Sequence, residues 1–146
     1  MKDKKESIEG LELAKVIAES ISDKKGSDII AINLANISTI ADYFVIASAN
    51  NNIQVRSIAE HIDEVLSKLH GIEPLRREGM QEARWVALDY STVIVHIFLN
   101  ETRQFYQLER LWINETNVLK YEDLCPVEPK ATKANGATAK SKASKV

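Results

Sequence analysis

The chain has 146 residues, of which 45% are hydrophobic and 27% charged, a composition that indicates one globular domain rather than two. Its single cysteine, Cys125, excludes an internal disulfide. No apolar run approaches the roughly 20 residues that a membrane-spanning helix needs, and the first residues do not resemble a signal or transit peptide. We therefore expect a cytoplasmic protein without a membrane partner.

In the first half of the chain, the hydrophobic pattern predicts two helices and two strands. Apolar residues at three- and four-residue steps indicate amphipathic helices over residues 7–25 and 53–70. Between them, the short apolar runs 28–34 and 43–47 are typical of strands that are covered on both faces. Two helices around a buried pair of strands indicate a layered α/β domain.

The second half adds a hairpin and a third helix. Residues 85–88 and 92–99 predict two strands that are joined by the tight turn Asp89-Tyr90-Ser91. A weaker strand over 73–77 contains a proline, which favours the edge of a sheet. Apolar residues on one side of 101–113 predict a helix. The expected fold is α/β, a single domain with a mixed sheet of about five strands flanked by helices.

The end of the chain differs in charge from the rest. Residues 129–146 contain five lysines and no acid, so residues 1–128 hold 14 of the 19 basic side chains against all 21 acids, a net charge of −7. We expect a folded domain over 1–125 and a disordered basic tail over 126–146, because the tail lacks the large apolar residues that would offset its ordering entropy. The tail is a solubilising segment or a weak, salt-sensitive contact to rRNA.

The residue inventory argues against catalysis. The five glycines are scattered singly, so the chain has no phosphate-binding loop. Asp28, Asp42 and Asp89 lie near strand ends but form no Asp-x-Asp pair that would hold a metal. His61 and His70 fall on opposite faces of the helix 53–70. We therefore expect no cofactor, no metal and no catalytic residue.

Large amphipathic side chains concentrate between residues 85 and 112. Six of the nine aromatic residues lie there together with Arg103 and Arg110, and Arg84 stands just before, a composition typical of protein interfaces. The alternative is that these rings form the core. Strand alternation places Trp85 on one face with Asp89, which favours a contact surface for Trp85. His96 lies within a strand, and we expect a hydrogen-bonded core or half-buried histidine.

Several blocks of the chain together resemble one known family. They are Asp42–Ser48, Gln54–Ala59, Glu78–Gly79, Trp85–Tyr90, Val93–Phe98 and Arg103–Trp112. The last block is the most specific, because an Arg-x-x-Tyr-x-Leu-Glu-x-Leu-Trp segment follows a Val-His-x-Phe strand directly. In this order, the chain resembles the ribosomal silencing factor family, also called Iojap-like proteins.

The resemblance implies a function that depends on binding and not on catalysis. Members bind the large ribosomal subunit through ribosomal protein L-fourteen and sterically block association with the small subunit, which represses translation in nutrient limitation. Their fold resembles the nucleotidyltransferase scaffold, here without a catalytic carboxylate pair. Two alternatives stay open: a nucleotidyltransferase-like enzyme or small-nucleotide-binding protein, and an RNA binder that uses the basic tail.

The resemblance also implies which side chains contact the ribosomal protein. They lie on a strand, its turn and the following helix: Trp85, Val86, Asp89, Tyr90, Arg103, Tyr106 and Arg110. An exposed aromatic patch of this kind can also pair with itself, so the sequence leaves open whether the free protein is a monomer or a homodimer.

Overall fold

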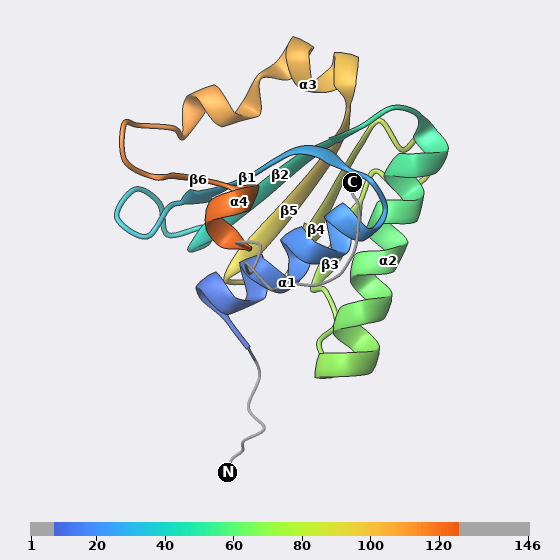
Figure 1. Ribbon diagram of the computed structural model, residues 1–146, viewed down its shortest axis with the longest axis horizontal. Helices are drawn as coiled ribbons and strands as arrows, with labels where there is room; N and C mark the ends of the chain where they lie inside the picture. Colours follow the sequence, from blue (N-terminus) through green and yellow to red (C-terminus); the bar gives the residue numbers. More distant parts are fainter. Residues whose placement is uncertain (1–7, 126–146) are drawn as a thin grey trace, which may run out of the picture.

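The computed structural model describes residues 8–125, and the predicted basic tail over 126–146 lies outside the described residues. Helices cover both faces of one sheet (Figure 1). The elements are α1 (Gly10–Asp23), β1 (Ser27–Asn33), β2 (Tyr43–Ala49), α2 (Asn52–His70), β3 (Arg76–Glu78), β4 (Trp85–Asp89), β5 (Val93–Leu99), α3 (Asn100–Tyr106), the 3-10 helix η1 (Leu108–Leu111), β6 (Val118–Lys120) and α4 (Tyr121–Leu124).

The sheet confirms the predicted α/β fold class and has one strand more than expected. Its order is β3-β4-β5-β2-β1-β6. β2 and β5 run parallel, and every other neighbouring pair is antiparallel. β6 pairs with β1 over three residues, which is too short for a pattern of alternating side chains to reveal it. β3 is an edge strand, as Pro74 just before it predicts.

The two helices with the clearest periodicity, α1 and α2, cover the first face of the sheet. Most of each apolar stripe is buried, and Ile17 and Ile62 have no exposed surface, whereas Leu69 at the end of α2 is 74% exposed. α2 begins where the side chain of Asn51 accepts a hydrogen bond from the Gln54 amide at 2.8 Å, and it ends at Gly71 with φ 66. Both predicted helices are confirmed, with ends that differ by at most three residues.

The predicted helix over 101–113 is wrong in its second half. α3 stops at Tyr106, Gln107 takes a left-handed backbone with φ 49, and a short 3-10 helix follows. The bend lets Leu108 pack on the sheet, while Phe105 before the bend and Leu111 after it are 79% and 75% exposed. A continuous apolar side was expected to be buried here, and the bend divides it.

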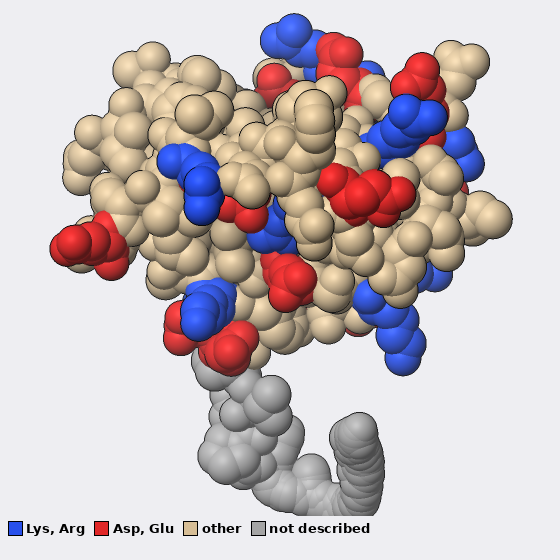
Figure 2. All heavy atoms as spheres, turned by 90° about the horizontal axis from the view of Figure 1, so that it is seen from above, with Lys and Arg blue, Asp and Glu red and all other residues tan. Residues whose placement is uncertain are grey.

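The second face of the sheet is covered only in part. The segment α3–η1 crosses it, opposite α1 and α2 (Figure 1). Beneath lies a small cluster of buried residues that is separate from the main core: Ile32, Leu34, Phe44, Ile46 and Phe98. Figure 2, which looks down on this side, shows a continuous area without Lys, Arg, Asp or Glu in its upper left part. This face of the sheet is therefore uncharged over a continuous area next to the α3–η1 segment.

Candidate functional site

Six aromatic rings form a row along the second face of the sheet. In order of contact they are Tyr106, Trp85, Phe98, His96, Phe44 and Trp112. The Trp85 indole stacks on Phe98 with ring centroids 4.8 Å apart and meets Tyr106 at 5.1 Å. At the other end, Phe44 packs edge-on against Trp112 at 5.6 Å. The aromatic row is therefore a rigid support whose end members reach the surface.

His96 lies in the middle of the aromatic row and is 8% exposed. Its Nδ1 accepts a hydrogen bond of 3.0 Å from the indole Nε1–H of Trp85. Its Nε2 is buried without a partner among residues 8–125. Burial lowers the pKa of His96 to about 4, so the imidazole is neutral at pH 7 and carries its proton on Nε2. The predicted hydrogen-bonded core histidine is confirmed.

Four of the seven predicted contact residues are accessible on the α3–η1 side of the molecule. Trp85 and Asp89 are half-buried on the same face of β4, as strand alternation predicts. Tyr106 is 54% exposed at the end of α3, and Arg110 is exposed in η1. These four side chains come from β4 and from the segment that crosses the sheet.

The other three predicted contact residues are buried. Val86 has no exposed surface and Tyr90 is 5% exposed, and both belong to the main core under α1 and α2. Burial raises the pKa of Tyr90, whose hydroxyl has no hydrogen-bond partner in the described part of the chain. Arg103 is 9% exposed because its guanidinium points into the fold. None of the three presents a side chain for direct contact in this structure.

The structure adds exposed apolar residues that the sequence pattern did not assign to the surface. Phe105, Leu111 and Ile113 are 79%, 75% and 41% exposed on or just after the α3–η1 segment. Ile37, 43% exposed, lies against the loop 114–117 that follows. We call Trp85, Phe105, Tyr106, Leu111 and Ile113 the apolar surface. The helical periodicity of 101–113 predicted that Phe105 and Leu111 would lie on one buried side, and it did not indicate the bend between them at Gln107.

A hollow of about 810 Å³ borders Trp85, between α3 and the loop that joins β3 to β4. α2 fixes this loop. Arg56 donates hydrogen bonds to the carbonyls of Met80 at 3.1 Å and Gln81 at 2.7 Å. Asn52 donates to the carbonyl of Glu82 at 2.9 Å. The hollow therefore has walls that are held in place before any partner arrives.

Gly79 sets how closely this loop approaches Trp85. It has φ 83, and a Cβ there would collide with the Trp85 carbonyl. Gly79→Ala should therefore lower the free energy of unfolding by about 2 kcal/mol or more, as urea denaturation would measure. Gly71 has a similar φ of 66 but open space around it, so Gly71→Ala carries only the backbone strain and should cost less. Equal losses in the two variants would contradict the collision.

Of the three aspartates near strand ends that the sequence pattern singled out, Asp28 and Asp42 lie at opposite ends of the sheet. Asp28 is the second residue of β1 and lies beside the end of β2, because Ser27 before it pairs with Ser48. Asp42 precedes β2 at the opposite end of the sheet, where its amide donates to the Thr92 carbonyl. Between residues 8 and 125, no three His, Cys, Asp or Glu side chains are close enough to hold a metal ion. No helix in that range is long and apolar enough to cross a membrane.

Comparison with known proteins identifies the family. The model of a family described as "Ribosomal silencing factor during starvation" matches residues 5–146. The chain belongs to the ribosomal silencing factor family. Ribosomal silencing factor RsfS of Halalkalibacterium halodurans is 41% identical over 101 residues, which cover 69% of this chain and 86% of that protein.

Two further comparisons extend the match. A crystal structure of a protein from Chromobacterium violaceum, 28% identical, superposes with a TM-score of 0.70 over 75% of this chain and 92% of that one. A mouse relative named "Mitochondrial assembly of ribosomal large subunit protein 1" is 24% identical over 99 residues, 66% of this chain and 43% of that protein. The resemblance that the sequence motifs indicate is thus confirmed for family and fold.

Proposed function

We propose that this chain binds the large ribosomal subunit in the cytoplasm through ribosomal protein L-fourteen and thereby prevents the small subunit from joining. The observation that carries the proposal is the apolar surface of a member of the ribosomal silencing factor family. The name of the mouse relative, which refers to the large ribosomal subunit, supports the same partner. The expected effect is repression of translation in nutrient limitation.

The apolar surface has the composition of a protein contact. Tryptophan and tyrosine are the side chains that most often dominate the free energy of protein association. Trp85 and Tyr106 adjoin the hollow of about 810 Å³, which would accept a side chain of the partner. The rings below them are packed into the aromatic row, so binding would immobilise few additional side chains.

The charge of the chain favours a protein contact over an RNA contact. Residues 1–128 carry a net charge of −7, which repels phosphates. A basic ribosomal protein would be attracted to the same charge, which speeds encounter and orients the two molecules. Any contribution of the basic tail to binding would be a weak contact with rRNA phosphates.

The proposed mechanism is occlusion and requires no catalysis. A domain that covers the joining face of the large subunit makes its own binding and subunit association mutually exclusive. By mass action, the fraction of joined ribosomes then falls as the concentration of the factor rises.

Subunit joining tests the proposal directly. Purified large and small subunits are mixed with increasing amounts of the protein and resolved on a sucrose gradient. We expect the peak of joined ribosomes to fall while the protein sediments with free large subunits. Unchanged joining at saturating protein would contradict the proposal.

A matched pair of variants shows whether the apolar surface is responsible. Leu111 and Leu69 are 75% and 74% exposed, but Leu69 lies on α2, which covers the first face of the sheet. Leu111→Asp should therefore lose most of the inhibition, because it buries a charge in the contact, and Leu69→Asp should keep it. Binding to isolated ribosomal protein L-fourteen, measured with the same pair, distinguishes a protein contact from an rRNA contact.

A further inference from the structure

Arg103 is the only Lys, Arg, Asp or Glu side chain that is buried in the described range 8–125. It belongs to α3, a helix of seven residues whose N-terminus has no side-chain cap. A guanidinium keeps its charge in a protein and offers five N–H donors. Its burial therefore requires acceptors that are placed around it.

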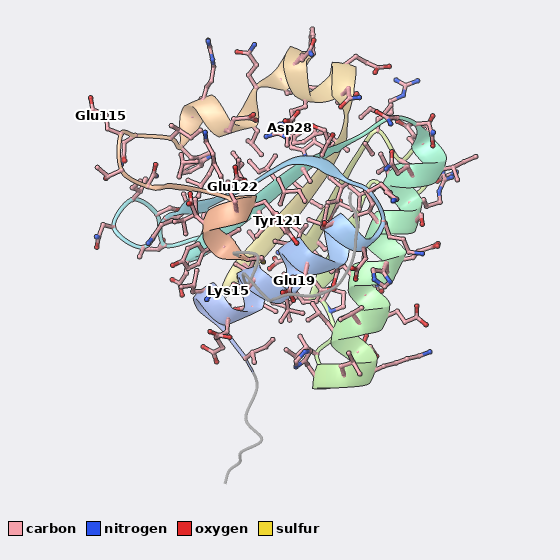
Figure 3. All side chains as sticks on the ribbon, in the orientation of Figure 1. Lys15, Glu19, Asp28, Glu115, Tyr121 and Glu122 are labelled. Atoms are coloured by element: carbon pink, nitrogen blue, oxygen red, sulfur yellow. The ribbon has the colours of Figure 1, made fainter. Side chains whose placement is uncertain are left out.

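The acceptors come from three separate segments. Arg103 Nη1 donates to Ser48 Oγ in β2 at 2.8 Å and to the carbonyl of Asp28 in β1 at 2.8 Å. Arg103 Nε donates to Glu109 Oε2 in η1 at 3.0 Å. Asp28 has φ 49 in the irregular first part of β1, and Figure 3 shows it below α3. The guanidinium thus ties the crossing segment to two adjacent strands of the sheet.

The same side chain also braces the bend in that segment. Gln107 has φ 49, a backbone conformation that residues with a Cβ rarely adopt. Arg103 stands before the bend and Glu109 after it, so their ion pair joins its two arms. The amide of Gln107 donates to the carbonyl of Arg103 at 2.8 Å. These contacts fix the direction of Tyr106, before the bend, relative to Leu111, after it.

We propose that Arg103 is a positioning residue for ribosome binding, which holds Tyr106 and Leu111 in the arrangement that meets the partner. The inference rests on the proposed function. It assigns Arg103 a role inside the fold in place of the direct contact that the sequence predicts. A surface that is ordered before binding loses less conformational entropy when it docks. Without the tether, α3 and η1 would have to be ordered at the moment of binding.

The test uses a side chain that the partner cannot reach. Ser48 is 2% exposed, so Ser48→Ala can affect binding only through Arg103 and the segment it holds. We expect Arg103→Met to lower the affinity for large subunits about tenfold or more and Ser48→Ala about threefold. The double variant should bind no more weakly than Arg103→Met, because Ser48 acts through Arg103.

Hydrogen–deuterium exchange supplies a readout that general destabilisation would not give. We expect faster exchange in residues 100–113 of both single variants, with unchanged protection in α2. Arg77→Met is the control, since Arg77 lies on edge strand β3 and the change removes its 2.7 Å ion pair with Asp63 of α2. Its exchange in 100–113 and its affinity should equal those of the unmodified protein.

Three outcomes would overturn the inference. The first is that Arg103→Met binds large subunits within twofold of the unmodified protein. The second is that adding Ser48→Ala to Arg103→Met lowers the affinity by the same factor as Ser48→Ala does alone. The third is that hydrogen–deuterium exchange in residues 100–113 is unchanged in the variants. Where Arg103→Met does not fold, Ser48→Ala and Glu109→Gln decide by the same two measurements. Failure of the unmodified protein to bind large subunits overturns the proposed function itself, whereas normal binding by Arg103→Met overturns only the role of Arg103.

Discussion

Replacing Trp85 by alanine is expected to weaken binding to the large ribosomal subunit by about 2 kcal/mol or more, at least about thirtyfold. Trp85 adjoins the hollow beside α3, and its indole stacks on Phe98 and meets the Tyr106 ring at a tilt. Truncation removes the ring that a partner would cover and also the ring that supports Tyr106. Affinity is measured by sedimentation of the protein with purified large subunits.

The same substitution also affects the fold, so a second variant is needed. Trp85→Ala leaves the Nδ1 of His96 buried without its donor, and a cavity opens over Phe98. Trp85→Phe keeps an aromatic ring on Phe98 but loses the hydrogen bond to His96 and part of the ring area. If the ring makes the contact, Trp85→Phe binds within a few-fold of the unmodified protein although it is less stable. Equal loss of binding in the two variants would assign the effect to the hydrogen bond with His96 instead.

The parts of the fold that depend on neighbouring residues could be predicted from the sequence. α1 and α2 have regular apolar stripes, and the hairpin of β4 and β5 follows from two apolar runs with a short turn between them. Alternation along β4 also placed Trp85 and Asp89 on one face and Val86 and Tyr90 on the other. The contact surface that the resemblance implies uses residues from both faces of β4. Because Val86 and Tyr90 are buried, only the face with Trp85 and Asp89 is open to a partner.

The bend after α3 could not be predicted, because its cause lies far away in the sequence. Gln107 is not a glycine, and nothing local indicates a left-handed backbone there. The conformation is held by Arg103, whose partner Ser48 is 55 residues away, and by packing of Leu108 on the sheet. A pattern read along one segment contains no information about either contact. The exposure of Leu111, and so the extent of the apolar surface, depends on this bend.

Acidification is expected to destabilise the protein through His96. The pKa of His96 is about 4 in the folded protein, against an ordinary value of 6.5, because burial disfavours the imidazolium. The unfolded chain therefore binds one proton more than the folded protein between these two values. The stability that neutral His96 contributes is fully present above about pH 6.5 and is lost as the pH falls toward 4. Between pH 7 and 5 the loss amounts to about 2 kcal/mol.

The loss of folding stability on acidification should come from protonation of His96 in the aromatic row. A proton on Nδ1 would face the indole N–H of Trp85 at 3.0 Å, so two donors would compete where one bond existed. Urea denaturation at pH 7 and pH 5 measures the effect, with His96→Asn as the reference that keeps an acceptor near Nδ1 and does not titrate. His96→Asn should be less stable at pH 7 but lose about 2 kcal/mol less on acidification. An identical pH dependence in both proteins would show that other carboxylates and histidines govern acid stability, and that His96 is not the acid-sensitive group of the aromatic row.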